Sequence, residues 1–304
     1  MAHVLGQNQY GKAETRVVRI TRGGARHEVK DLSVSVALSG DLDDVHLTGD
    51  NANCLPTDTA KNTCYAFAKQ YGIASAEEYG TRLARHFVDD VEPIHRARIR
   101  IEEYFWDRIR TPRAQGRFIG SEEVGHSFVR RGSEVRTAEV VWDGSALQVV
   151  SGLHGLVVMN STDSEFWGYI KDRYTTLKEA YDRVLATEVT ARWRHSFTGA
   201  PGQEEPDWDG CWAEVRRHLL EAFAETYSYS LQQTLHAMGI RVLDHVPGVD
   251  EIRLQLPNKH HFAVDMEPYG LRNENEVFFA ADRPYGLIEG TVHREGTVPV
   301  IPVD

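Results

Sequence analysis

Residues that could bind or act on a ligand occur in three separate segments of the second half of the chain. Pro257 to Phe262 places an amide, an ammonium and two imidazoles between two alternating segments. Gln232 falls in the first turn of a predicted helix, where backbone N–H groups have no intrahelical partner. Arg183 lies well off the apolar stripe of another predicted helix, so it is free to face solvent or a ligand. Taken singly, these segments fit a ligand site and a solvated turn or surface alike.

Several familiar catalytic and metal-binding motifs are absent or incomplete. Gly6 to Ala13 imitates the phosphate-binding loop Gly-x4-Gly-Lys, but Ala13 replaces the Ser or Thr that holds magnesium, and too few residues precede it for a strand. Lys12 in this segment fits a solvated surface lysine better than a base on spacing alone. No His-x3-His pair has a suitable third ligand, and His260 and His261 as strand neighbours point to opposite faces. The nucleophile elbow Gly-x-Ser-x-Gly is missing too. We therefore expect no metal site.

The composition is that of a folded, acidic protein. Its 304 residues are 41% hydrophobic and 26% charged. The 34 Lys and Arg residues against 45 Asp and Glu residues give a formal net charge of -11. This charge argues against duplex nucleic acid as a partner, and an anionic ligand would need a local basic pocket.

Cysteine usage and the apolar runs favour a reducing compartment without a membrane segment. Cys54, Cys64 and Cys211 show no Cys-x-x-Cys spacing, which indicates buried or inert thiols. No run of about 18 apolar residues is present, and Met1 to Asn8 lacks the profile of a signal peptide. Because Ile301 to Asp304 is not a Ser-Lys-Leu peroxisomal address, we expect a cytoplasmic protein.

The first half of the sequence predicts a hairpin, two helices and further strands. Two alternating apolar segments between Val17 and Leu38 are separated by Gly23-Gly24. Thr57 to Lys69 predicts a helix that Thr57-Asp58 opens, and Ser75 to Glu78 is a capping box for a second helix. The apolar stripe of that second helix is Tyr79, Leu83 and Phe87, and strands follow around Ile99 to Ile109 and Val135 to Trp142.

The second half repeats this order of elements. Thr176 to Glu179 is a capping box for a helix whose apolar stripe includes Leu177 and Tyr181. A longer helix from Asp209 onward breaks before Ser230, and Ser230 to Gln233 is a capping box that starts the next helix. The predicted strands are Leu147 to Met159, Glu188 to His195, Ile252 to Leu256, Phe262 to Met266 and Val277 to Ile288.

This order predicts an α+β fold with antiparallel sheets, because pairs of strands alternate with pairs of helices. Gly144-Ser145 is the natural boundary, so the expected domains are residues 1–144 and 145–304.

Read together, several segments resemble the urate oxidase (uricase) family, and the resemblance runs over nearly the whole chain. Their order and spacing make the combination specific, although several of them are weak singly. The segments are Tyr10-Gly11-Lys12, Thr57 to Thr63, Ser164 to Gly168, Asp172 to Leu177, Asp182 to Leu185, Leu231-Gln232, Leu256 to His260 and Asp282 to Ile288.

The resemblance implies a quaternary structure as well as a fold. The family has the tunnelling fold, with two domains of antiparallel sheet and helix pair in each chain. Four chains form a barrel-like homotetramer with active sites at the subunit interfaces. Thr57 and Asp58 would then come from the neighbouring chain.

The resemblance also implies how a planar purine is held. Arg183 and Gln232 would bind its edge, and Phe166 would stack on its face. The backbone N–H groups of Leu231 and Asp58 would add contacts. This set suits the urate anion, because a guanidinium fork, a carboxamide and an aromatic ring match its oxygens, ring N–H groups and flat surface.

The implied reaction is the oxidation of urate by molecular oxygen, in purine degradation, to 5-hydroxyisourate and hydrogen peroxide, without metal or organic cofactor. Lys12, relayed through Thr57 and completed by His260, would remove a proton from urate. Asn258, with Thr57, would position oxygen and later water above the ring. A lysine serves as a base when a partly desolvated pocket lowers its pKa.

The chain departs from the family pattern at two positions, and two other functions remain open. Leu231 replaces a common Val, and His261 stands where an aromatic residue is frequent; residues 92–131 match no motif and are assigned to strands and a variable loop. One alternative is a pterin-forming hydrolase or aldolase of the same fold, some of which use zinc. The other is a purine-binding scaffold that has lost the chemistry.

Overall fold

The computed structural model describes residues 3–23, 26–109 and 126–303. The chain forms two compact units, one of Met1–Gly152 with His195–Asp209 and one of Leu153–Arg194 with Gly210–Asp304. This division does not fall at Gly144-Ser145, because strand β7 (Leu147–Asn160) begins in the first unit and ends in the second. No helix in the described ranges is long and apolar enough to cross a membrane.

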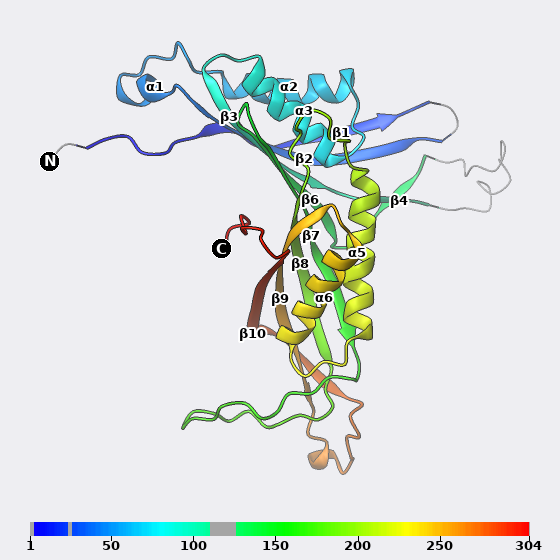
Figure 1. Ribbon diagram of the computed structural model, residues 1–304. Helices are drawn as coiled ribbons and strands as arrows, with labels where there is room; N and C mark the ends of the chain where they lie inside the picture. Colours follow the sequence, from blue (N-terminus) through cyan, green and yellow to red (C-terminus); the bar gives the residue numbers. More distant parts are fainter. Residues whose placement is uncertain (1–2, 24–25, 110–125, 304) are drawn as a thin grey trace. The chain divides into compact units, whose positions relative to one another are not determined.

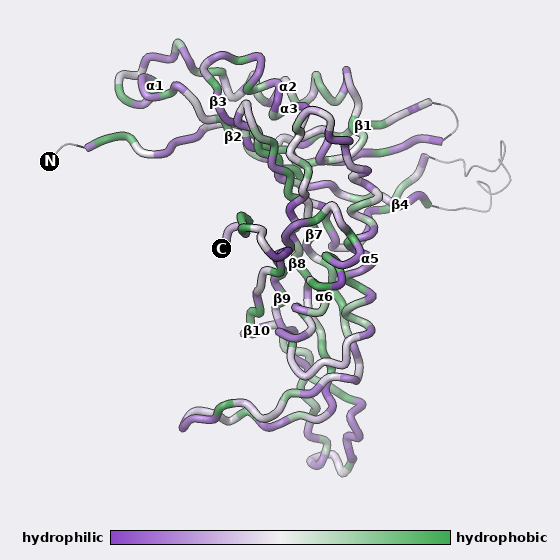
Figure 2. Tube along the Cα trace, in the orientation of Figure 1, coloured by the Kyte–Doolittle hydropathy of each residue, from purple (hydrophilic) through white to green (hydrophobic). Residues whose placement is uncertain are grey.

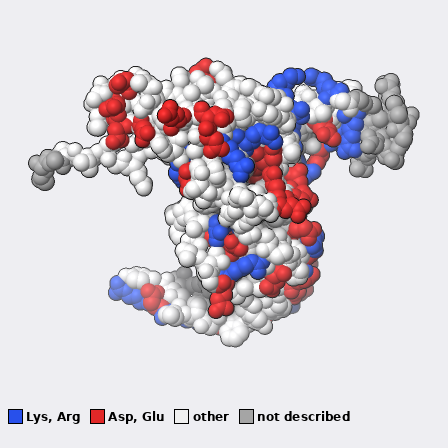
Figure 3. Space-filling model, turned by 45° about the horizontal axis from the view of Figure 1, so that its top comes forward, with Lys and Arg blue, Asp and Glu red and all other residues white. Residues whose placement is uncertain are grey.

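The first unit is an antiparallel sheet in the order β1-β2-β3-β6, with the start of β7 beside β6. Helices α2 and α3 pack on one face of this sheet (Figure 1). Figure 3 shows acidic side chains gathered at the α1 end of the unit. The elements are β1 (Tyr10–Thr21), β2 (Glu28–Gly40), α1 (Asp43–Leu47), α2 (Thr57–Gln70), α3 (Ala76–Asp89), β3 (Ile94–Glu103), β4 (Trp106–Arg108), β5 (Phe128–Arg130) and β6 (Val135–Trp142).

Alternation along the strands builds the core of this unit, as the sequence predicted. Figure 2 shows apolar residues recurring along the strands. The predicted stripe of α3 is fully buried, and the Tyr79 hydroxyl donates to the Cys64 carbonyl at 2.5 Å. Cys64 is buried, as predicted, and burial raises the pKa of its thiol to about 12, which disfavours the reactive thiolate form. Ser75 caps α3 by accepting from the Glu78 N–H.

A β-bulge interrupts the ladder between β1 and β2 directly after Lys12. Lys12 pairs with Val36 and Thr15 with Val34, so two residues of β1 face one residue of β2, and Glu14 adopts a φ of 54°. At Gly11, a Cβ would lie 1.9 Å from the Val36 carbonyl oxygen, so no other residue type fits there. Bulges bend a strand and redirect its side chains, and this one fixes where Lys12 leaves the sheet.

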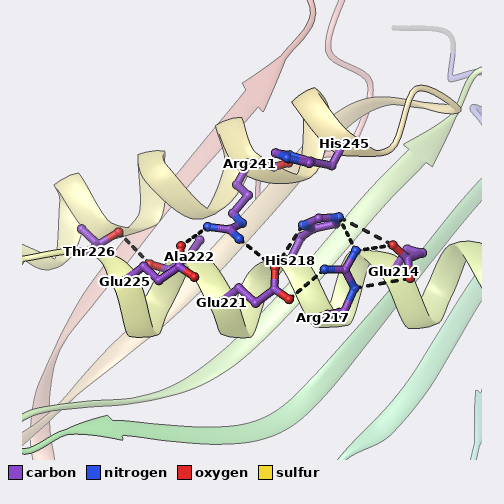
Figure 4. A network of polar contacts seen from close by, with 9 residues as sticks. All are labelled: Glu214, Arg217, His218, Glu221, Ala222, Glu225, Thr226, Arg241 and His245. Carbon is purple, nitrogen blue, oxygen red and sulfur yellow. Dashed lines mark hydrogen bonds and ion pairs between the residues drawn. The ribbon is translucent and has the colours of Figure 1, made fainter.

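The second unit is an antiparallel arrangement of β7, β8, β9 and β10 with helix α6 packed on β9 and β10. Helices α5 and α6 are linked by ion pairs, among them Arg241 to Glu221 at 2.8 Å (Figure 4). Ser230 caps α6 by accepting from the Gln233 N–H, as predicted. The elements are β8 (Leu185–His195), α5 (Trp208–Glu225), α6 (Leu231–His245), β9 (Val249–Ala263), a 3-10 turn (Glu267–Tyr269) and β10 (Phe278–His293). The α+β class with antiparallel sheets is confirmed.

Local predictions were wrong in two segments. Thr176 to Glu179 starts no helix, because Phe166 and Ala180 pair through their backbones at 2.8 and 3.0 Å, and the expected stripe residues Leu177 and Tyr181 are exposed. The segment around Asn258 is not a connection, because β9 runs through it and Asn258 pairs with Gly286 of β10.

Helix α2 begins at Thr57, as predicted. Thr57 does not cap this helix; Pro56 occupies the N-cap position, and no side chain there accepts a hydrogen bond. Parts of two other predictions, Gly24 of the first hairpin and residues 110–125 of the variable loop, lie outside the described residues.

Candidate active site

A cavity of about 710 Å³ in the second unit collects most of the predicted site residues. Its walls come from the irregular segment that contains residues 166 and 176–184, from the start of α6, and from β9 and β10. Six of the predicted residues border it: Phe166, Arg183, Leu231, Gln232, Asn258 and His260. They come from separate parts of the sequence, and the fold of one unit brings them together.

Arg183 is held at the cavity wall by Ser164. Its Nε donates to the Ser164 hydroxyl at 3.0 Å, and its backbone N–H donates to the Ser164 carbonyl at 2.9 Å. Ser164 is 1% exposed, and it forms a backbone bridge to Ser228. Burial lowers the pKa of Arg183, but a guanidinium stays charged at any physiological pH. With Nε engaged by Ser164, the terminal nitrogens have no partner among the described residues and can take an anion.

Phe166 forms an aromatic wall beside this cation. Its ring stacks on Tyr169 with centroids 5.0 Å apart, and the Arg183 guanidinium carbon lies 5.3 Å from the Phe166 ring centre. The backbone pairing of Phe166 with Ala180 fixes where this ring leaves the chain. A planar ligand stacked on Phe166 would therefore lie within reach of the charge of Arg183.

The first turn of α6 supplies amide groups. Leu231 borders the cavity and is 2% exposed, so most of its side chain packs into the unit. Gln232 is exposed. The N–H groups at the start of a helix have no intrahelical acceptor and favour an anion. A Leu at this position therefore leaves the backbone contact possible, since the side chain points elsewhere.

Asn258 and His260 are two residues apart on β9 and thus share one face of the strand. The pKa of His260 is lowered by burial and, to a smaller extent, by the charges of Arg183 and His261. The imidazole is therefore neutral at neutral pH and can accept a proton. His261 also borders the cavity, and its Nδ1 lies 3.0 Å from the Lys259 carbonyl.

Lys12, Thr57 and Asp58 do not border this cavity and belong to the first unit. Thr57 and Asp58 form the first turn of α2. The Asp58 carboxylate accepts from Lys61 at 2.5 Å and Asn62 at 2.9 Å; these contacts lower its pKa, and the charge of Lys12 adds a smaller effect. Lys12 thus lies close enough to the start of α2 to act on it electrostatically.

Sequence reasoning missed the part played by Ser164. This residue lies in a segment that carries the family resemblance, but its bond to Arg183 depends on a backbone path that no local pattern predicts. Among the residues described by the structure, no group of three or more His, Cys, Asp or Glu side chains is placed to hold a metal ion.

Comparisons with known proteins show which family the chain belongs to. A sequence profile of the Uricase family matches residues 8–141 and 149–289. The chain belongs to the uricase family. All predicted site residues, from Lys12 to His260, fall within the two ranges that match the uricase profile.

Individual uricases are similar to this chain over most of its length. A uricase from Arthrobacter globiformis is 50% identical over 294 residues, which cover 97% of this chain and 91% of that protein. A uricase from Dictyostelium discoideum is 37% identical, over 95% of this chain and 97% of its own. The crystal structure of the uricase from Arthrobacter globiformis has a TM-score of 0.90 at 49% identity and covers 99% of both chains. A uricase structure from Bacillus fastidious, at 23% identity and a TM-score of 0.77, shares the fold.

Proposed function

We propose that this protein is an oxidoreductase that oxidises urate with molecular oxygen and water to 5-hydroxyisourate and hydrogen peroxide, in purine degradation. The observation that carries the proposal is the cavity of the second unit, where a guanidinium, a carboxamide and an aromatic ring converge. Urate at neutral pH is a flat anion with carbonyl oxygens and ring N–H groups. The three side chains match its charge, its hydrogen-bonding edge and its face.

The proposed binding of urate follows from the hydrogen-bond donors and acceptors and the aromatic ring that line the cavity. The two terminal nitrogens of Arg183 donate to acceptors of urate, since Ser164 already engages Nε. Gln232 both donates and accepts, so it can pair with a ring edge that presents both kinds of group. The ring of Phe166 lies against the purine face.

The oxidation needs a base, because urate becomes more reducing when it loses a second proton. Lys12 is the proposed base. Thr57 relays the proton between urate and Lys12, and His260 completes this proton relay. The neutral imidazole of His260 supports this role, since one ring nitrogen can donate and the other accept a hydrogen bond in the relay. Two electrons then pass from urate to oxygen, which leaves as peroxide, and water adds to the oxidised ring. Asn258, with Thr57, positions oxygen and then water, and no cofactor takes part.

Lys12 and Thr57 are remote in sequence from the cavity residues and lie in the other unit, which fits a site completed by a neighbouring chain. We accordingly propose a homotetramer in which Thr57 and Asp58 of one chain complete the cavity of another. The tandem tunnelling-fold domains at residues 1–144 and 145–304 and the cytoplasmic location stay predictions.

The deciding experiment follows oxygen uptake, urate absorbance and peroxide release with purified protein in excess chelator. We expect urate and oxygen to be consumed in equal amounts, with one peroxide formed for each. Urate binding without consumption would favour the scaffold function. Absence of binding would reopen the pterin-type alternative, and loss of activity in chelator would indicate a metal.

A further inference from the structure

A second cavity, of about 760 Å³, lies in the first unit and carries no residue of the proposed urate site. It is bordered by the segment before β1, by the end of β2 and by β3. Two of its lining residues are Arg96 and Arg98, and three are the amides Gln7, Asn8 and Gln9. Among the described residues, no carboxylate lines it.

The two arginines lie on the sheet face opposite the helices. Ala97, Ile99 and Ile101 of β3 are buried in the core, so the alternating residues Arg96, Arg98 and Arg100 point the other way. Residues two apart on a strand are about 7 Å from each other, which places three positive charges in a row. Their partners on β2 are the small residues Ser39, Ala37 and Ser35, which leave room above the sheet for the arginine side chains.

Nearby carboxylates neutralise Arg96 and Arg98 only in part. Hydrogen bonds from Ala146 and Ser145 lower the pKa of Asp143, and the charge of Arg96 adds a smaller effect. Glu139 accepts from Arg100 at 2.5 Å, and Asp143 accepts three hydrogen bonds from Ser145 and Ala146. In the described ranges, the side chains of Arg96 and Arg98 have neither a hydrogen bond nor an ion pair. The pKa of Arg98 is lowered by burial and then by Arg100 and Arg96, while Glu139 opposes this shift. The charge of the row is thus only partly compensated, in a chain whose net charge is -11.

The opposite wall of the cavity is polar and anchored. The Ser39 hydroxyl donates to the Asn8 carbonyl at 3.1 Å, which fixes the segment before β1 on the end of β2. The side-chain amides of Gln7 and Gln9 are exposed and have no partner among the described residues. They add neutral donors beside the two guanidinium groups.

We propose that this cavity, which we call the Arg96/Arg98 groove, binds a small oxyanion, a phosphate or a carboxylate. The planar fork of a guanidinium donates two parallel hydrogen bonds to either group, and two forks on one face can hold one anion between them. The proposal is independent of the urate assignment, because the two sites share no residue.

Isothermal titration of the intact protein with inorganic phosphate, at constant ionic strength and neutral pH, tests the groove. A second titration with succinate distinguishes a phosphate from a carboxylate ligand. The test variant is Arg96→Gln with Arg98→Gln. Two single variants serve as controls: Arg98→Gln tests whether both forks are needed, and Arg22→Gln removes one exposed charge at the opposite end of β1.

We expect saturable binding of one oxyanion per chain, at least about tenfold weaker in the double variant and unchanged in Arg22→Gln, since hydrogen bonds to charged groups are each worth about a factor of ten or more. An anion bound at Arg183 would survive in the double variant, so unchanged binding there would overturn the proposal. No binding to the wild type would overturn it too. If the double variant instead changes the sedimentation coefficient and no oxyanion binds, the groove is a contact between chains.

Discussion

Ser164→Ala isolates the one contact that orients Arg183 without touching the proposed substrate. The substitution removes the acceptor of the 3.0 Å bond from Nε and leaves the backbone bond between the two residues in place. A buried hydrogen bond to a charged group is worth about 1.5–3 kcal/mol, part of which appears as lost stability. If about 1–2 kcal/mol reaches substrate binding, KM for urate rises about 5- to 30-fold.

The kinetic pattern separates positioning from chemistry. In the proposed site Arg183 would contact urate in the ground state and the transition state alike, so we expect kcat to change less than about twofold. Ser161→Ala, at an exposed position in the same segment, is the matched control and should behave as wild type. Urea unfolding of each variant measures how much of the lost hydrogen-bond free energy appears as a lower free energy of unfolding.

A double-mutant cycle completes the test. Arg183→Lys keeps the positive charge but lacks Nε and the planar guanidinium, so we expect KM for urate to rise. In the Arg183→Lys background Ser164→Ala should raise KM little further, because the bond that it removes is already absent. If Ser164→Ala leaves KM unchanged, or raises it equally in both backgrounds, Ser164 does not act through Arg183.

Three further perturbations test other parts of the structure. Lys12→Ala should lower kcat by at least about a hundredfold with little change in urate binding, because a base acts on the transition state; single-turnover and binding assays check this, and an unchanged kcat would refute the role. Gly11→Ala should destabilise by more than about 2 kcal/mol in urea unfolding, because the new Cβ would overlap the Val36 carbonyl; wild-type stability would contradict the close approach. Burial lowers the pKa of His195 in the folded chain from 6.5 to about 3. Between these two pH values the unfolded chain binds one proton more than the folded chain. The free energy of unfolding is therefore highest above pH 6.5 and falls as the pH is lowered towards 3. The loss at pH 4.5 is about 2–3 kcal/mol, and His195→Gln should show a correspondingly flatter profile between pH 7 and 4.5.

Features that depend on a few neighbouring residues were predictable. Ser75 and Ser230 cap their helices because the acceptor and the N–H it serves are three residues apart, and no distant group is needed. The buried stripe of α3 follows from helical periodicity in the same way. The site residues were named through a family resemblance carried by segments such as Leu256 to His260, which the profile match supports as a whole.

Features that depend on long-range pairing were not predictable. Thr176 to Glu179 has a helix-start pattern, but Glu179 instead accepts from Lys171 at 3.0 Å, and the backbone of Ala180 pairs with Phe166. Likewise Asn258, a residue that favours turns, lies within a strand because β10 supplies its partner across the sheet. In both places a tertiary contact outweighs a preference worth only a fraction of a kilocalorie per residue.

The sequence by itself therefore determined the fold class, the starts of α3 and α6, and the chemical types available for binding an anion. Only the tertiary structure decided that Ser164 holds Arg183, that a bulge follows Lys12, and that Arg96 and Arg98 share a groove without a carboxylate. The reason is one of range. Capping and periodicity act over one or two turns of chain, whereas a cavity depends on which distant backbone segments pair, and their register sets the position of every side chain in it.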